Sequence, residues 1–286
     1  SRRARGEAGT YRRRALLATC LNFIVRDPRK LGNVHDPARI PRVLDQLRRT
    51  WEGQPDLPLA TLFGILANRG AGWGTTDEEL EQLLIDESFA HPSDLPRAQD
   101  GRVSDDVLVE TVSPAHRVTL TAAGDVVVRS LGDRDRQPSV WQYDSVRPTG
   151  PGQMLTIADS EGVEHRLGVV TLISRIDSSV TGSDTGTGTG TGTGSGQDTP
   201  AVSSIDGLER DTIGNAVWLV LLEDGARLLI TQRLHMWQVD RRAVTKTTHA
   251  WNQVVRCRMG ENFVYETAGG EAVALGEVVK LLLVES

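Results

Sequence analysis

The part of the chain that follows residue 104 presents the same features twice in the same order, and this repeat restricts the fold more than any other property of the sequence. The first copy contains VTLTAAGDVVVRSL at residues 118–131, a pattern typical of a hairpin about Gly124. The second copy contains WLVLLEDGARLLITQ at residues 218–232, a hairpin about Asp224 and Gly225. We take these two segments as counterparts and predict an internal duplication.

Two more pairs of features support the repeat. The stretch WQYD at 141–144 is matched by WQVD at 237–240. The alignment is ambiguous at one point, because Trp141 can be matched with Trp251 nearly as well as with Trp237. The second copy therefore contains an insertion, at residues 241–249. Each copy closes with two glycines before a final apolar strand: Gly162 and Gly168 in the first copy, Gly270 and Gly276 in the second.

The repeated region is rich in β-branched residues and in Gly and Asp turns, which is typical of short antiparallel strands. We therefore predict an α+β protein in which two related, mainly antiparallel β modules, residues 105–173 and 207–286, follow a helical domain. Each copy has room for roughly five strands, which suits a small SH3-like or other five-stranded barrel. The alternative is a single sandwich formed by both copies.

Residues 174–206 separate the two copies and contain five consecutive Thr-Gly pairs, from Thr185 to Gly194. Glycine removes backbone restraint and nothing apolar is available to bury, so this composition predicts a disordered tether. By random-coil scaling such a segment spans roughly 30 Å, enough to connect two small domains or to loop out between two strands of one domain. A shorter linker, residues 91–104, is expected between the helical domain and the first copy.

Three stretches between residues 36 and 90 have the apolar spacing of short amphipathic helices. Asp36 and Pro37 suit the start of the first helix, and Thr76 with Glu79 forms a capping box for the third. Because short helices cannot bury their apolar faces singly, we predict that they pack as a three-helix unit in a domain spanning residues 15–90. The residues expected on the buried faces are Ile40, Val43, Leu44, Leu47, Trp51, Leu59, Leu62, Phe63, Leu66, Leu80, Leu83 and Leu84.

The same region carries a resemblance to a known family. Residues 39–84 contain RIPRVLDQLRRTW, then PDLPLATLFGIL, then a Gly-containing loop and TDEELEQLL. In this order, with a helix ending in Trp51, a turn at residues 55–57 and a helix start at Thr76 and Asp77, they resemble the YihD-like family of short bacterial helical proteins. The resemblance implies a helical fold and a bacterial origin. It supplies no activity and no catalytic residues to transfer.

The N-terminal arm, residues 1–14, carries six arginines against one acid, whereas the whole chain has a net charge of −6. The arm ends in Arg12, Arg13 and Arg14, and such a segment can attract nucleic-acid phosphates through counterion release. A solvated tail is the simpler interpretation. The acidic remainder of the chain argues against a surface built for nucleic acid or for an anionic membrane.

Residues 15–25, ALLATCLNFIV, follow the arm, but only four apolar residues separate Arg14 from Cys20, which is too few for the apolar region of a signal peptide, and no Ala-x-Ala cleavage site follows before Asp27. We predict a short core helix there, with Cys20 as a small buried side chain. No run approaches the roughly 20 apolar residues of a membrane helix. The sequence therefore predicts a soluble, cytoplasmic protein with no membrane partner.

Motifs of catalytic and cofactor sites are absent from the sequence, including GxSxG, HExxH, GxxxxGK[ST] and CxxC. His235, His249 and Cys257 are the best metal-ligand set, but their spacing matches no structural zinc site. The glycine-rich NRGAGWG at residues 68–74 could hold a phosphate before a helix start. Because the acids at residues 77–79 and Glu81 would repel an anion and suit a solvated helix start, we predict a helix–helix turn there. We expect no enzyme activity, cofactor or metal.

Trp141 and Trp237 are the remaining candidate site residues. An aromatic side chain at the rim of a small barrel is a common ligand platform, and it is equally the large core residue that such a barrel needs. The core role is favoured. The leading hypothesis is a non-enzymatic interaction or scaffold protein whose linked modules bind another protein. The alternatives are nucleic-acid binding through Arg12, Arg13 and Arg14, and an enzyme of unrecognised class with a pocket formed by distant segments.

Overall fold

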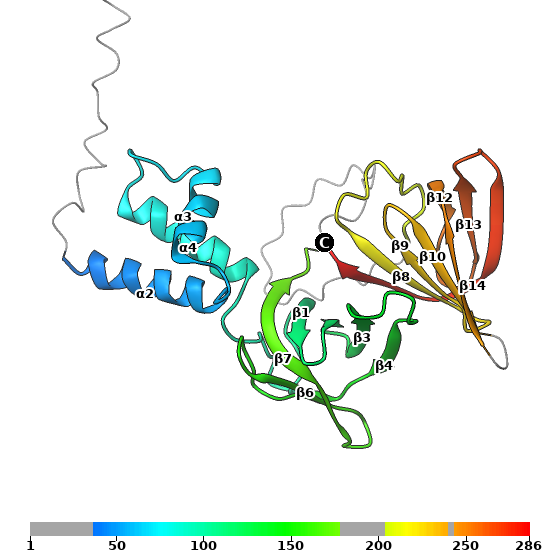
Figure 1. Cartoon of the computed structure of the whole chain (residues 1–286), viewed down its shortest axis with the longest axis horizontal. Helices are drawn as coiled ribbons and strands as arrows, with labels where there is room; N and C mark the ends of the chain where they lie inside the picture. The colour runs from blue at the N-terminus through cyan, green and yellow to red at the C-terminus, as the bar shows by residue number, and fades with distance from the viewer. Residues whose placement is uncertain (1–36, 178–203, 240–242) are drawn as a thin grey trace, which may run out of the picture. The chain divides into compact units, whose positions relative to one another are not determined.

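A computed structural model describes residues 37–177, 204–239 and 243–286 of the chain (Figure 1). The arginine arm, the apolar segment 15–25 and the Thr-Gly pairs all lie outside the described residues. The chain divides into two compact units, Ser1–Asp45 and Gln46–Ser286, and every contact described below lies within the second unit. Across the described ranges, no helix combines the length and the apolar character needed to cross a membrane.

Three helices form the N-terminal part of the described chain, as predicted (Figure 1). They are α2 (Arg39–Glu52), α3 (Leu59–Asn68) and α4 (Asp77–Ala90). The capping box is present, because the Thr76 hydroxyl accepts from the Glu79 N–H at 3.2 Å and the Glu79 carboxylate accepts from the Thr76 N–H at 2.9 Å. These two bonds satisfy backbone donors that a helix start leaves unpaired.

The helices pack through a small core in which Leu62, Leu66 and Leu84 are fully buried. The predicted stripe on α2 is buried only in part: Val43 and Leu47 are half-buried, whereas Ile40, Leu44 and Trp51 are 53%, 57% and 39% exposed. The side of α2 that faces α4 is polar instead. Gln46 Nε2 donates to Ser88 Oγ at 2.8 Å, and Thr50 Oγ1 donates to the Leu84 carbonyl at 2.9 Å. Phe63 of α3, also expected inside, is 44% exposed.

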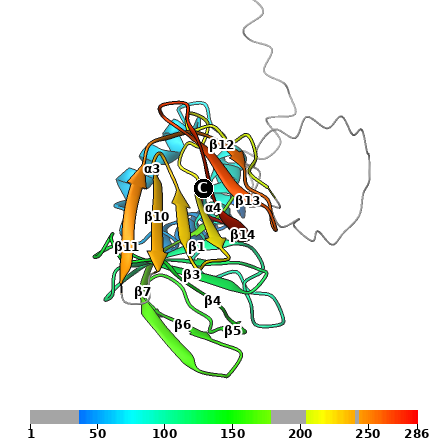
Figure 2. The same cartoon turned by 90° about the vertical axis from the view of Figure 1, so that its right-hand side faces the viewer.

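Two seven-stranded antiparallel sheets follow the helices, each curled into a half-barrel (Figures 1 and 2). The first has the order β4-β3-β2-β1-β7-β6-β5 and the second the order β11-β10-β9-β8-β14-β13-β12. The orders are identical when β1 is matched with β8, β2 with β9 and so on along the chain. The first sheet comprises β1 (Val107–Val112), β2 (His116–Leu120), β3 (Asp125–Ser130), β4 (Ser139–Gln142), β5 (Ser145–Val146), β6 (Met154–Ala158) and β7 (Glu164–Arg175). The second comprises β8 (Val217–Leu222), β9 (Arg227–Ile230), β10 (Leu234–Val239), β11 (Val244–His249), β12 (Trp251–Arg256), β13 (Asn262–Thr267) and β14 (Ala272–Glu285).

The prediction of two related antiparallel β modules is confirmed, with seven strands in each sheet instead of roughly five. The additional pairing comes from the long last strands. The first half of β7 pairs with β6 and its second half with β1, and β14 does the same with β13 and β8. Each module has a hydrophobic core of its own, centred on Leu120 and Ile157 in the first and on Leu228 and Phe263 in the second. The modules therefore do not form a single sandwich around one core.

The strand order corrects the predicted alignment of the two copies. The hairpin about Gly225 joins β8 and β9, so its counterpart is the β1–β2 hairpin rather than the β2–β3 hairpin about Gly124. Likewise, residues 241–249 contain β11, which is the counterpart of β4 and not an insertion. Two predicted glycines do correspond, because Gly162 and Gly270 occupy the same turn with φ of +78° and +80°.

Long-range hydrogen bonds show which aromatic residues are equivalent. The Tyr143 hydroxyl donates to the Thr121 carbonyl at 2.9 Å, and the Trp251 indole N–H donates to the Thr231 carbonyl at 2.9 Å. Thr121 follows β2 and Thr231 follows β9, so Tyr143 and Trp251 hold the same place in the two modules. Trp141, on β4, and Trp237, on β10, lie on strands that do not correspond.

The two modules are in contact through the outer faces of their sheets. The sequence VWLVLL of β8 alternates between two apolar environments, with Trp218 in the core of the second module and Leu219 in a separate cluster outside it. That cluster also contains Val127 from the first module and Val284 from β14. A strand buried on both faces has a continuous apolar sequence. The picture of modules spaced only by a tether therefore does not hold for the described residues.

Candidate functional site

Trp237, one of the two predicted binding tryptophans, lies at the contact between the modules. Its side chain is 2% exposed, and its indole N–H donates to the Asp135 carbonyl at 2.7 Å. Lys246 of β11 lies over the same ring at 5.3 Å and donates to the Arg134 carbonyl at 2.7 Å. Asp135 and Arg134 belong to the loop between β3 and β4 in the first module. Trp237 therefore binds another part of the same chain, the loop between β3 and β4.

Arg227 of β9 completes this contact. Its guanidinium donates to the Pro138 carbonyl in the same β3–β4 loop. Burial lowers the pKa of Arg227 from its ordinary value, although the group remains cationic at any physiological pH. Arg227, Trp237 and Lys246 therefore donate to three main-chain oxygens of residues 134–138.

A second group of polar contacts holds the end of β14 against the first module. Glu285 accepts from Arg117 Nη1 at 2.7 Å and from Arg129 Nη1 at 3.0 Å. The Val284 carbonyl accepts from Thr119 Oγ1 at 2.7 Å and from Arg129 Nη2 at 3.2 Å. Burial lowers the pKa of Arg129, and the Glu285 carboxylate opposes that shift. These contacts stabilise the packing of the modules.

Trp141 has a different environment. It is half-buried and packs against the core of the first module, with its ring 5.6 Å from that of His165. His165 Nε2 lies 2.9 Å from Asp159 Oδ2, and this hydrogen bond is the main cause of the lowered pKa of the Asp159 carboxyl. Trp141 and Trp237 lie in different modules and are not brought into one site. The predicted binding residues Arg12, Arg13 and Arg14 lie outside the described residues.

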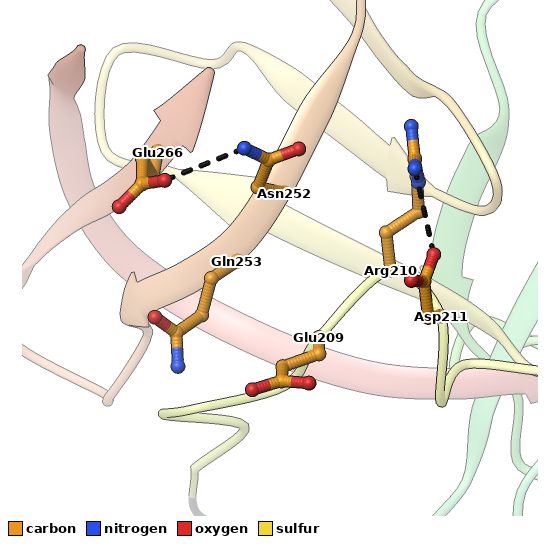
Figure 3. A pocket seen from close by; sticks show the side chains of 6 residues that line it. All are labelled: Glu209, Arg210, Asp211, Asn252, Gln253 and Glu266. Atoms are coloured by element: carbon orange, nitrogen blue, oxygen red, sulfur yellow. Dashed lines mark hydrogen bonds and ion pairs between the residues drawn. The ribbon is translucent and has the colours of Figure 1, made fainter. Parts of the chain in front are cut away.

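A polar pocket of about 260 Å³ opens in the second module (Figure 3). Its side chains pair mostly with one another, since Asn252 donates to Glu266 at 3.4 Å and Arg210 to Asp211 at 3.4 Å. The pocket contains no histidine, serine or cysteine that could serve as a base or nucleophile beside the carboxylates. Its lining residues are Glu209, Arg210, Asp211, Asn252, Gln253 and Glu266 (Figure 3).

The residues considered as metal ligands have separate partners. His235 bonds to Thr248 and His249 to Thr247, each at 3.0 Å. Cys257 is buried, and burial raises the pKa of its thiol to about 12. In the part of the chain that the structure describes, no three histidine, cysteine or carboxylate side chains are grouped as a metal would require.

Among the described residues, the most exposed large hydrophobic side chain is one that the sequence pattern places in an ordinary turn. Four aromatic side chains of the described ranges are more than a third exposed, and all four lie in the helical region. Trp73 is fully exposed, and it sits between two glycines in the loop from α3 to α4. An aromatic residue between glycines was the one signal available in the sequence. The four exposed aromatic residues are Trp51, Phe63, Trp73 and Phe89.

The loop is held on both sides of Trp73. Before it, the Ala71 N–H donates to the Leu66 carbonyl at 3.0 Å. Across it, the Gly72 N–H donates to Thr75 Oγ1 at 2.7 Å, and the Thr75 N–H returns to the Gly72 carbonyl at 3.0 Å. These bonds form a tight turn that projects the indole ring into solvent.

A hollow of about 520 Å³ lies between the loop and α4, and Gly72 and Gly74 line it while Trp73 itself does not. Its wall includes Arg69, whose guanidinium lies 2.7 Å from the buried carboxylate of Glu87, which also accepts from Gln54 Nε2 at 2.8 Å. The first residue of the loop is therefore fixed to the core of the helical unit. We call residues 69–83 the Trp73 surface. The hollow is lined by Arg69, Gly70, Gly72, Gly74, Thr75, Glu79, Gln82 and Leu83.

No protein-family model, curated protein or solved structure matches the chain. The resemblance of residues 39–84 to the YihD-like family therefore stays a prediction.

Proposed function

We propose that this protein binds another protein through the Trp73 surface and that it is not an enzyme. The observation that carries the proposal is the complete exposure of Trp73 on a loop that hydrogen bonds hold in one shape. Burying a tryptophan side chain of roughly 200 Å² contributes on the order of 5 kcal/mol. Tryptophan is also among the residue types that dominate binding energy at interfaces.

The connection to the β modules supports this role. Phe89 at the end of α4 lies under the guanidinium of Arg175 in β7, at 4.1 Å from the ring centroid. Just after α4, His91 Nδ1 lies 3.1 Å from Ser174 Oγ. These contacts attach the helix that follows the Trp73 loop to the first module. A side chain held on a supported element loses less conformational entropy when it binds.

We also infer that the two β modules arose by duplication of one ancestral module. Their strand orders are the same, and both carry a buried aromatic residue bonded to the carbonyl after the second strand. In this proposal the paired modules act as the scaffold and the helical unit as the binding element.

The proposal is tested by affinity capture with the full-length chain and two variants. Trp73→Ala removes the exposed ring, whereas Met259→Ala removes an exposed apolar side chain of the second module, 53% exposed, as a matched control. Proteins from a bacterial extract are captured on each and quantified by mass spectrometry. A partner retained by the wild type and by Met259→Ala but lost by Trp73→Ala supports the proposal. An identical set of captured proteins on all three chains contradicts it.

A further inference from the structure

The first half of α2 carries apolar side chains that the described residues bury only in part. Ile40 and Leu44 lie one helical turn apart and are 53% and 57% exposed, and Val43 beside them is half-buried. Single exposed aliphatic side chains are ordinary, but three on adjacent turns of one helix form a stripe of the kind that packs against another element. We call Ile40, Val43 and Leu44 the α2 stripe.

The segment of residues 15–25, ALLATCLNFIV, has an apolar face of matching length. It contains no charged residue. Eleven residues in a helix extend about 16 Å, which is enough to cover the turns of α2 that carry the stripe. A short helix gains most of its stability by packing its apolar face, so this segment needs a partner surface. The residues that fall on one side of it at helical spacing are Leu16, Leu17, Cys20, Phe23 and Ile24.

The chain between the segment and the stripe is short. Residues 26–39, RDPRKLGNVHDPAR, separate Val25 from Ile40, and they include Pro28 and Gly32, residues that interrupt a helix and suit a change of chain direction. A connection of this length spans roughly 20 Å on average, whereas packed helices lie about 8–10 Å apart. The connection therefore lets the segment reach the stripe of its own chain.

A short connection also favours the segment over any separate molecule. Tethering converts binding into an intramolecular event with an effective concentration of about 1 mM or more. A second copy of the chain or another protein competes at a far lower concentration. The occupant that the length of the chain favours is therefore the chain's own segment.

We propose that residues 15–25 bind the α2 stripe of the same chain and cover it. The segment and the stripe both belong to the compact unit Ser1–Asp45, so the contact lies within one unit. Docking also anchors Arg12, Arg13 and Arg14 next to α2, because these arginines directly precede the segment. The inference goes beyond the proposed function, since it does not involve the Trp73 surface.

The thiol of Cys20 measures this contact in the full-length protein. The other cysteine, Cys257, is fully buried, so iodoacetamide at pH 8 reports on Cys20, and mass spectrometry follows its labelling. The test variant is Ile40→Ser with Leu44→Ser. The matched control is Val163→Ser with Met259→Ser, which changes two side chains of similar exposure, 51% and 53%, in the β modules.

Cys20 is expected to react at least thirtyfold more slowly in the wild type and in the control than in the chain unfolded in urea. The test variant removes two side chains from the stripe and is expected to label Cys20 about tenfold faster than the wild type. Because Ile40 and Leu44 are both more than half exposed, their substitution leaves the core of Leu62, Leu66 and Leu84 in place.

A disulfide cross-link locates the contact. Leu44→Cys places a thiol on the stripe. Arg42→Cys places one about 200° around the same helix, at nearly the same separation from Cys20 along the chain, and is the matched control. Oxidation with diamide, followed on non-reducing gels, is expected to link Cys20 within one chain at least tenfold faster in Leu44→Cys than in Arg42→Cys.

Four results would overturn the proposal. They are labelling of Cys20 in the wild type as fast as in the unfolded chain, equal labelling of the wild type and the Ile40→Ser, Leu44→Ser variant, equal cross-linking of the two cysteine variants, and a Leu44→Cys cross-link that joins two chains with a yield that rises with protein concentration. The last result would show that a second copy occupies the stripe. None of these measurements depends on Trp73, so the proposed function stands or fails separately.

Discussion

Removing the carboxylate of Glu285 tests the packing of the two β modules. Glu285 is the acidic partner of Arg129, whose side chain is only 12% exposed. Without Glu285, Arg129 keeps the Val284 carbonyl at 3.2 Å as its hydrogen-bond acceptor among the described residues. Leaving a buried charge without its counter-ion costs about 3–5 kcal/mol. Because Glu285 is itself 18% exposed and solvent screens part of the interaction, we expect Glu285→Ala to lower the free energy of unfolding by about 3 kcal/mol.

Urea-induced unfolding at pH 7, followed by tryptophan fluorescence, measures this loss. Arg147→Ala is the control, because the ion pair between Arg147 and Glu164 is 66% and 40% exposed and should contribute no more than about 1 kcal/mol. A double variant that combines Glu285→Ala with Arg129→Met removes the uncompensated charge as well. We expect the double variant to be more stable than Glu285→Ala alone.

Two results would refute this reasoning. One is a loss for Glu285→Ala no larger than that for Arg147→Ala, which would mean that the modules do not bury this pair in solution. The other is a double variant less stable than the single one, which would mean that Arg129 stabilises the contact without its counter-ion.

The remaining experiments test local features. Gly168→Ala should lower the free energy of unfolding by about 2–4 kcal/mol, because the φ of Gly168 is +114° and the new Cβ would lie within 2.9 Å of three oxygen atoms. A Cβ on Gly72 meets no atom, so Gly72→Ala should be neutral or stabilise by up to about 1 kcal/mol. Equal melting temperatures of the two variants would contradict this reasoning. Tyr143→Phe should cost about 2 kcal/mol in urea unfolding, since its buried hydroxyl bonds to two backbone groups; a cost near zero would argue against the matched aromatic sites. With Cys20→Ser in the background, iodoacetamide at pH 8 should label Cys257 only after unfolding, because burial raises the thiol pKa from 9.0 to about 12; rapid labelling of the folded chain would show the thiol to be accessible. By linkage, the stability contributed by the neutral thiol is present below pH 9 and declines as the pH rises toward 12, which alkaline unfolding curves check.

Local signals in the sequence predicted the individual elements well. The capping box at Thr76 and Glu79 placed the start of α4, and the turn glycines Gly162 and Gly270 marked the last hairpin of each module. These signals succeed because each depends on residues close together in the chain. The order of helices followed by two related β modules was predictable on the same basis.

The matching of the two copies was not predictable from local patterns. Every hairpin in such a sheet alternates with the same period of two, so the β8–β9 hairpin resembles both β1–β2 and β2–β3. Only contacts between distant residues, such as Tyr143 with Thr121 and Trp251 with Thr231, distinguish the two alignments. The error in α2 has a similar origin. Its buried side is set by hydrogen bonds from Gln46 and Thr50 to α4, which the apolar stripe does not reveal.

The exposure of Trp73 could not be predicted from local sequence patterns either. Tryptophan in a short loop is compatible with burial under a neighbouring helix, and the outcome depends on the turn bonds that Gly72 makes with Thr75. Trp237 shows the opposite case. Its role depends on the loop of the other module that covers it, and no pattern within either copy indicates that contact.

The loop of residues 134–138 is held by hydrogen bonds to its main-chain carbonyl oxygens, and this affects how its sequence can vary in evolution. Every residue type has a carbonyl, so apart from Asp135, whose carboxylate also pairs with Lys246 at 3.0 Å, the loop can change its side chains while keeping the same bonds to Arg227, Trp237 and Lys246. The positions that carry the three donor side chains lack this freedom, because few other side chains could donate a hydrogen bond from there. We therefore expect related chains to vary in sequence in this loop and to keep the hydrogen-bond donors on the facing strands.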